Sequence, residues 1–155
     1  MKGNKKIIEH LNVLLADELT AINQYIVHSE MCENWGYAIL NEAIKKRAIE
    51  EMTHAEKLIA RILFLEGTPA VGTLNKISIG SDIEEQFKND QYAETDAIKK
   101  YNDGIKLCTE LGDNGTRELL QSNLEEEENH LDWLETQLEQ IKQMEITNYL
   151  VDQTA

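Results

Sequence analysis

The chain has 155 residues and a net charge of −14, from 29 acidic and 15 basic side chains. Such a charge argues against binding to nucleic acid, whose phosphates need basic partners, and it suits a protein that collects cations. Proline occurs once and the composition favours helices over sheets. We expect no membrane span, because no apolar run approaches roughly 20 residues. Cys32 and Cys108 form no CxxC motif or disulfide framework and the first residues carry no apolar signal core, so we expect a cytoplasmic protein.

Apolar residues repeat with the period of an α-helix along four long stretches. The short turns Asn34-Trp35-Gly36 and Asp113-Asn114-Gly115 divide these stretches into two pairs, and a short turn makes its two helices antiparallel neighbours. A capping box, Ser81-Asp82-Ile83-Glu84, opens the third stretch. The sequence therefore predicts a single all-α domain over residues 1–155, with helices at about 5–33, 35–65, 82–111 and 115–144 and a short fifth helix at about 146–151.

The stretch from Gly67 to Gly80 is not periodic and contains three glycines and the only proline. Extended at about 3.3 Å per residue, it reaches roughly 45 Å, which is also the length of a helix of about 30 residues. It can therefore run the length of the bundle, which makes the second and third helices parallel. We expect Gly67 to end the second helix, and Leu74, Ile77 and Ile79 to hold the crossover against the surface beneath it.

A glutamate interrupts the apolar stripe of each long helix. The spacing from Glu18 to Glu51 in the first pair of helices equals the spacing from Glu94 to Glu127 in the second, which indicates a duplicated hairpin. Two of these glutamates are followed three residues later by a histidine on the same helix face, as Glu51-Met52-Thr53-His54 and Glu127-Glu128-Asn129-His130. Taken alone, Glu18 or Glu94 would be interpreted as a surface residue. In the acidic run 125–128, only Glu127 has the phase of the core.

Four carboxylates and two imidazoles that converge at one level of a bundle form a metal site. Four buried carboxylates without counter-charge would cost many kcal/mol, and two divalent cations would balance their charge. A mixed set of oxygen and nitrogen ligands favours iron or manganese over calcium, and a site for a soft metal would need thiolates. Di-iron and di-manganese carboxylate bundles have this arrangement.

Over essentially its whole length, the chain resembles the bacterioferritins. The matching segments are Met1-Lys2-Gly3, Glu18-Leu19-Thr20-Ala21-Ile22-Asn23-Gln24-Tyr25, Glu51-Met52-Thr53-His54-Ala55-Glu56, Arg61-Ile62-Leu63-Phe64-Leu65-Glu66-Gly67 and His130-Leu131-Asp132-Trp133-Leu134-Glu135-Thr136. The resemblance implies a ferritin-like four-helix bundle with a long crossover between the second and third helices. It also implies a hollow 24-subunit shell that stores ferric mineral, with the short fifth helix around the four-fold axes.

The resemblance also implies a ferroxidase centre with two iron ions per subunit. One ion would be held terminally by Glu18 and His54, the other by Glu94 and His130, and both would be bridged by Glu51 and Glu127. Tyr25 matches a tyrosine close to this centre, although a core tyrosine would fill the same position on the stripe.

Met52 matches the methionine that ligates haem, b-type or related, between two subunits of a bacterioferritin. Met52 lies about 100° from the core stripe, so it should face a partner, and a methionine in a plain dimer interface is the alternative. Leu19, Asn23, Ile26 and Ile49 lie on faces that would line the haem pocket. Haem would carry electrons for iron release, with a small iron–sulfur ferredoxin as their donor.

One difference from the family concerns the wall of the storage cavity. Several bacterioferritins have a histidine and an aspartate at the positions of Lys46 and Glu50. Lys46 and its neighbour Arg47 are cationic and cannot ligate iron at neutral pH. We therefore do not expect an accessory iron site of that kind.

These features predict iron storage with ferroxidase activity, with Fe(II) and O2 or H2O2 as substrates. One alternative is a stand-alone di-iron or di-manganese peroxidase of the rubrerythrin type, although the CxxC module usual in that family is missing from this sequence. A second alternative is a helical interaction protein without chemistry, which would bind no metal.

Overall fold

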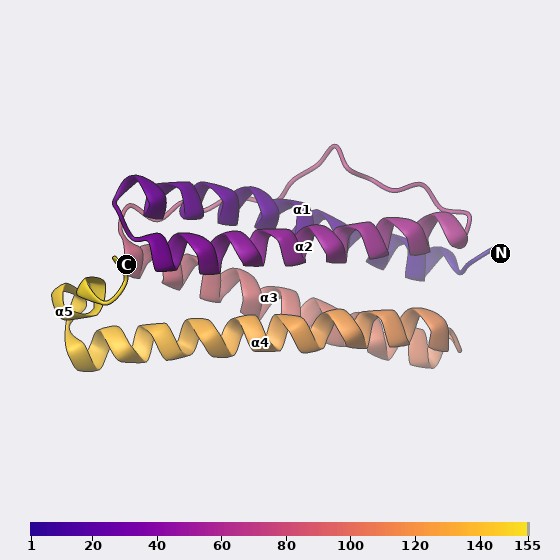
Figure 1. Cartoon of the computed structure of the whole chain (residues 1–155). Coiled ribbons are helices and arrows are strands. Elements are labelled where there is room, and N and C mark those ends of the chain that lie inside the picture. The colour runs from indigo at the N-terminus through magenta and orange to yellow at the C-terminus, as the bar shows by residue number, and fades with distance from the viewer. Residues whose placement is uncertain (155) are drawn as a thin grey trace.

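The computed structural model describes residues 1–154, so Ala155, the last residue of the predicted domain, lies outside the described residues. Within them the helices are α1 (Lys5–Asn34), α2 (Ala38–Phe64), α3 (Ile83–Glu110), α4 (Asn114–Met144) and α5 (Ile146–Val151). α1 and α2 form one antiparallel hairpin and α3 and α4 another, with α5 at one end of the bundle (Figure 1). The predicted ferritin-like four-helix bundle with a short fifth helix is confirmed. In residues 1–154 no helix is both long and apolar enough to cross a bilayer.

The turn between α1 and α2 lies one residue later than the predicted Asn34-Trp35-Gly36. Gly36 has a φ of +82°, and the amide of Tyr37 donates to the carbonyl of Cys32, which closes α1 with a left-handed cap. Trp35, Gly36 and Tyr37 are all used in this cap, so α2 begins at Ala38 and not at residue 35.

The end of α2 differs from the prediction that Gly67 terminates it. The left-handed residue is Glu66, at a φ of 64°, and the amide of Gly67 donates to the carbonyl of Ile62. Glycine is needed at position 67 because a Cβ there would lie 2.6 Å from Cγ2 of Ile8. The requirement is therefore close packing against α1, and not a positive φ.

The capping box at the start of α3 is shifted by one residue from the predicted one. Asp82 is the N-cap, and its carboxylate accepts a 2.8 Å hydrogen bond from the amide of Glu85. The side chain of Glu85 in turn accepts hydrogen bonds from the amide and hydroxyl of Ser81. Glu85, and not Glu84, is therefore the glutamate of this cap, and its side chain binds the residue before the N-cap.

The crossover between α2 and α3 runs along the bundle and makes these two helices parallel, as predicted (Figure 1). The prediction that its apolar side chains hold it in place is wrong, because Leu74, Ile77 and Ile79 are exposed. Its backbone amides bind polar side chains of α1 instead. These hydrogen bonds measure 2.8–3.0 Å and run from Ala70 to Asn12, Asn75 to Thr20, Ser78 to Gln24 and Gly80 to His28. An extended segment without a neighbouring strand needs such acceptors for its amides.

Two apolar clusters fill the interior, one towards each end of the bundle. The first includes Leu11, Leu15, Leu58, Ile62 and Leu120, and the second includes Leu40, Ile44, Phe87, Leu134 and Ile141. Each long helix contributes to both clusters, and the glutamate that interrupts its stripe lies between the two contributions. The apolar core therefore encloses one polar layer near mid-bundle.

Candidate metal centre

The polar layer between the two clusters contains all six predicted metal-site residues. Each has a side chain buried to at least 98%, and they come from all four long helices: Glu18, Glu51, His54, Glu94, Glu127 and His130. Their phase explains this burial. Glu51, for example, lies three residues after Ala48 and four before Ala55, both of which are buried, so its side chain points to the same interior.

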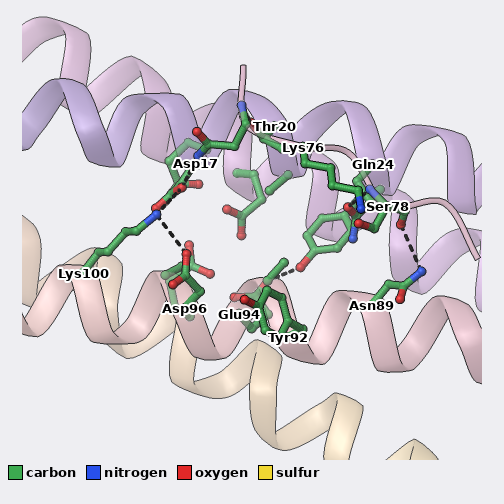
Figure 2. Close-up of a pocket in the computed structure, with 18 residues that line it drawn as sticks. Asp17, Thr20, Gln24, Lys76, Ser78, Asn89, Tyr92, Glu94, Asp96 and Lys100 are labelled. Carbon is green, nitrogen blue, oxygen red and sulfur yellow. Dashed lines mark hydrogen bonds and ion pairs between the residues drawn. The ribbon is translucent and has the colours of Figure 1, made fainter. Parts of the chain in front are cut away.

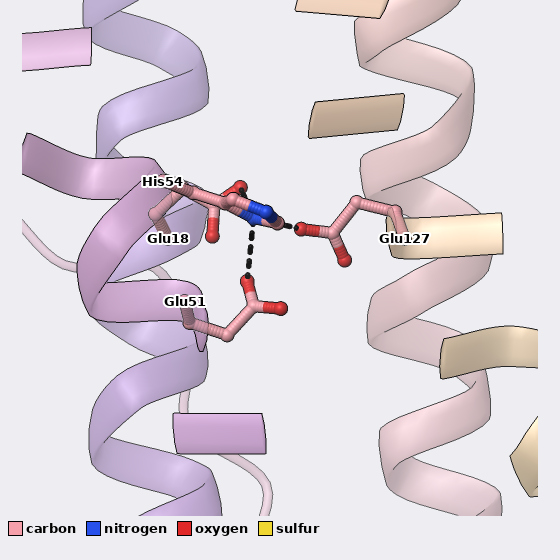
Figure 3. Close-up of side chains that lie close together, drawn as sticks. All are labelled: Glu18, Glu51, His54 and Glu127. Atoms are coloured by element: carbon pink, nitrogen blue, oxygen red, sulfur yellow. Dashed lines mark hydrogen bonds and ion pairs between the residues drawn. The ribbon is translucent and has the colours of Figure 1, made fainter. Parts of the chain in front are cut away.

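The six side chains form two overlapping groups. Glu18 and His54 belong to the first and Glu94 and His130 to the second, and both groups share Glu51 and Glu127. In each group, atoms able to ligate a metal lie within 4.8 Å of one another. Figure 3 shows the first group, in which the imidazole lies among carboxylates from three helices. This geometry suits two adjacent cations that share two carboxylates.

Each imidazole turns Nδ1 towards the shared carboxylates and Nε2 away from them. Nδ1 of His54 lies 2.8 Å from Oε1 of Glu127, and its Nε2 lies 3.0 Å from Oε2 of Glu126. Likewise, Nε2 of His130 lies 2.5 Å from Oε2 of Glu50. A proton on Nε2, donated to the outer glutamate, leaves a lone pair on Nδ1 for a cation.

Two tyrosines each bind one of the carboxylates that belong to a single group. The hydroxyl of Tyr25 donates to Oε1 of Glu94. The hydroxyl of Tyr101 donates a 2.5 Å hydrogen bond to Oε1 of Glu18 and accepts one of 3.2 Å from the side-chain amide of Asn123. Tyr25 therefore contacts the site and does more than fill the core stripe.

The structure adds three residues to the predicted site: Tyr101, Glu126 and Glu50. The stripe pattern alone predicts Tyr101 as a core residue and Glu126 as a solvated one, and both interpretations are incomplete. The sequence offset that relates Glu18 to Glu94 also relates Tyr25 to Tyr101 and Glu50 to Glu126. The duplication therefore points from Tyr25 to Tyr101, whereas Glu50 and Glu126 are related only to each other.

Burial and mutual repulsion divide the four buried carboxyls into two kinds. Burial and the neighbouring carboxylates raise the pKa of Glu51 and that of Glu127 well above the usual range. Burial alone would also raise the pKa of Glu18 and that of Glu94. Hydrogen bonds from the shared carboxyls, imidazoles and tyrosines outweigh it, so both pKa values are lowered. Without metal, the shared carboxyls therefore bind protons more tightly than the other two.

The two imidazoles also bind protons tightly. Burial alone would lower their pKa values, but hydrogen bonds and charges from the surrounding carboxylates outweigh it. The pKa of His54 is raised, and that of His130 is raised to about 9. Protons thus supply the positive charge that metal ions would otherwise supply.

Several buried atoms of the centre lack a hydrogen bond. Oε2 of Glu18 and Oε2 of Glu94 have no hydrogen bond or salt bridge, and Oε1 of Glu51 and Oε2 of Glu127 share Nδ1 of His130, at 2.9 Å and 3.6 Å. A buried polar atom without a partner costs about 1–3 kcal/mol, so this layer requires an explanation. Carboxylate oxygens with imidazole nitrogen, and no thiolate, are a donor set for iron, manganese or a similar divalent cation. The residues present therefore fit a pair of such ions.

Comparison with known proteins identifies the family. The model of the ferritin-like domain matches residues 8–144. The bacterioferritin of Rhodobacter capsulatus is 45% identical over 138 residues, which cover 89% of this chain and 86% of the relative. Those of Brucella melitensis and Mycobacterium tuberculosis are 42% and 40% identical, over 90% of this chain and 86% and 87% of the relatives. The chain belongs to the bacterioferritins. The resemblance found in its sequence motifs is thereby confirmed.

The residues that the bacterioferritin resemblance assigns to haem lie on the surface of the α1–α2 hairpin. Leu19, Asn23 and Ile26 follow one face of α1, and Ile49 and Met52 follow one face of α2. Met52 is 45% exposed and Ile49 is 55% exposed, and Ile26 on the adjacent helix is 45% exposed. A thioether is a haem ligand, so the exposed donor fits haem. The assignment itself stays a prediction.

The cationic side chains that argue against an accessory iron site, Lys46 and Arg47, lie on α2. Lys46 is exposed, and the guanidinium of Arg47 lies over the ring of Trp133 at 5.1 Å from its centroid. Glu50 lies beside them in an open groove and is bound to His130. The expectation that no accessory iron site forms here stays a prediction. Glu50 contacts the candidate centre through the imidazole of His130.

Proposed function

We propose that the protein stores iron and oxidises Fe(II) to Fe(III) at the buried centre. The observation that carries this proposal is the pair of overlapping groups that share Glu51 and Glu127. In this proposal, one Fe(II) binds Glu18 and His54 and the other binds Glu94 and His130, while the two shared carboxylates bridge them. Bacterioferritin relatives over nearly the whole chain support iron as the metal.

The side chains perform two tasks in the proposed reaction. The carboxylates balance the charge of two Fe(II) ions, and they lose their own protons as the ions bind. Glu126 and Glu50 hold Nε2–H of the imidazoles so that Nδ1 faces the metal. Oxidation of two Fe(II) releases two electrons, which with two protons reduce O2 to H2O2, or H2O2 to two waters.

We also propose that the subunits assemble into a shell of 24, in which Met52 and its counterpart on a second subunit hold haem. The support is the family membership and the exposed apolar row on α1 and α2. When bound, haem would supply electron transfer to stored ferric iron, with an iron–sulfur ferredoxin as donor. Met52, Ile49 and Ile26 would hold it by ligation and apolar contact.

The ferroxidase proposal is tested by stopped-flow oxidation of Fe(II) with O2. Glu94→Ala and His130→Ala should each abolish the fast phase while the assembly stays intact, because each removes a terminal ligand. Glu128→Ala is the matched control, since Glu128 is an exposed glutamate on the same helix. Fast oxidation at the wild-type rate in both ligand variants would overturn the assignment.

Particle size separates the proposal from its alternatives. Each subunit has a mass of 17.8 kDa, so a shell of 24 would have twelve times the mass of a dimeric peroxidase and would elute far ahead of it in gel filtration. An iron assay and a visible spectrum on the same fractions would then test for metal and haem. A helical interaction protein would show neither.

A further inference from the structure

A cavity of about 450 Å³ connects the metal centre with the protein surface. It lies between α1, α3 and the crossover, and its inner wall is formed by Glu18, Glu51, Glu94 and Glu127. Its outer wall includes exposed side chains, among them Tyr92 and Lys76. The buried carboxylates of the centre therefore lie at the inner end of a path from solvent on this side of the bundle.

Three charged side chains form the mouth of this cavity. Lys100 of α3 reaches across to α1, with Nζ 3.0 Å from Oδ1 of Asp17 and 2.9 Å from Oδ2 of Asp96 (Figure 2). We call Asp17 and Asp96 the mouth carboxylates. Lys100 is 29% exposed and its stem is flexible, so its ammonium has access to solvent.

The mouth carboxylates are not fully balanced by this lysine. They carry two negative charges against one positive charge. Oδ1 of Asp17 accepts hydrogen bonds from Lys100 and from the side-chain amide of Asn75, whereas the buried Oδ2 accepts none. Lys76 also lines the cavity, but within residues 1–154 it forms no salt bridge with either carboxylate.

The opposite side of the centre offers a less suitable approach. The groove there contains Lys46, Arg47, Glu50, Glu126 and Asp132, but of the six residues of the centre only His130 reaches it. No carboxylate of the centre lines that groove. The cavity behind Lys100 is instead lined by all four of them at its inner end.

We propose that the mouth carboxylates are a staging site for divalent cations on their way to the metal centre, and that the ammonium of Lys100 is the resident cation that each arriving ion displaces. A divalent ion between Asp17 and Asp96 balances both charges, which the single charge of Lys100 does not. Displaced Lys100 turns to solvent, and the ion then moves inward to the carboxylates of the centre. The inference rests on the proposed function, because the centre is the destination of the ion.

Co(II) is a suitable probe, because its visible absorption reports binding without oxidation. The wild-type protein, freed of metal, should bind two Co(II) per subunit, and stopped-flow absorbance gives the rate. Lys100→Met leaves the mouth with two unbalanced carboxylates and should speed binding by about tenfold at low ionic strength. Asp96→Asn leaves the lysine with a single carboxylate and should slow binding by a similar factor. Lys99→Met, at an exposed neighbour outside the cavity, is the control for net charge.

The two variants change the rate in opposite directions, which a general loss of folding would not do. Added salt should reduce the difference between them, because the effect is electrostatic steering. If Lys100→Met and Asp96→Asn each bind two Co(II) per subunit at the rate of Lys99→Met, the staging site is overturned and the metal centre still stands. The same holds if Lys100→Met slows binding. Absence of Co(II) binding by the wild type would overturn the centre and the staging site together.

Discussion

The hydroxyl of Tyr101 donates a 2.5 Å hydrogen bond to Oε1 of Glu18, a carboxylate on the neighbouring helix α1. The same contact occurs between Tyr25 and Glu94 in the other half of the duplicated bundle. Each tyrosine fixes one oxygen of a terminal carboxylate and leaves the other oxygen without a hydrogen bond. The two halves of the proposed centre therefore use the same device to orient the free oxygen.

Tyr101→Phe should destabilise the metal-free protein by about 1–3 kcal/mol, because it leaves Oε1 of a buried, ionised carboxylate without its donor. It should also weaken Co(II) binding, because Glu18 is then no longer oriented. Thermal unfolding and Co(II) titration measure the two effects. Tyr92→Phe is the control, since Tyr92 is 77% exposed on the same helix. Equal behaviour of the two variants would show that the hydrogen bond has no role in the site.

Glu126→Gln should reduce the affinity of the centre for divalent metal by about tenfold. The carboxylate of Glu126 accepts from Nε2 of His54 and so helps to keep Nδ1 free for the metal. A neutral amide is a weaker acceptor and holds this tautomer less firmly. Competition with a chelator of known affinity measures the change. Glu125→Gln, at the neighbouring position, should leave the affinity unchanged.

The location of the centre could be predicted from sequence because burial on a helix depends on phase alone. Glu51 and Glu127 interrupt regular stripes, so their positions indicate the interior without knowledge of any contact. The outer partners of the histidines were harder to find. Glu126 lies in an acidic run and its side chain is 41% exposed, and only the duplication distinguishes it from its neighbours.

The length and direction of the crossover could be predicted from the sequence, but the contacts that hold it against α1 could not. Leu74, Ile77 and Ile79 suggest apolar contact, but the segment is held by its amides. Those hydrogen bonds join residues far apart in the sequence, and no local pattern reports them. The acceptors Thr20 and Gln24 are one helical turn apart on α1, which is recognisable only once the crossover lies beside them.

The metal-free protein should become less stable as the pH rises from 6.5 to 9. The pKa of His130 is raised from 6.5 to about 9, so the folded state holds a proton that the unfolded state has lost in this range. The contribution of this proton to the free energy of unfolding is fully present below pH 6.5. It disappears as the pH passes about 9, a loss of about 3 kcal/mol. The raised pKa values of Glu51 and Glu127 act in the same direction.

Thermal unfolding of chelator-treated protein at pH 6.5 and 9 measures this effect. His130→Gln should show a smaller difference between the two pH values, because it lacks the titrating imidazole. Saturating Zn(II) should reverse the trend, since the metal competes with protons for the same atoms and binds better at high pH. A wild-type midpoint that rises between pH 6.5 and 9 without metal would contradict the assignment of protons to this centre.

Met52→Leu should abolish haem binding and leave Fe(II) oxidation unchanged. Met52 is the exposed thioether on the α1–α2 surface, whereas the proposed iron ligands lie in the buried layer, so the two functions depend on different atoms. Leucine keeps the apolar volume, and a dimer that depends only on apolar contact would therefore persist. The haem absorption band per subunit and the rate of Fe(II) oxidation are the two measurements. Met144→Leu, at the end of α4, is the control and should retain haem. Haem bound equally by Met52→Leu and the wild type would show that Met52 is an interface residue without a ligand role.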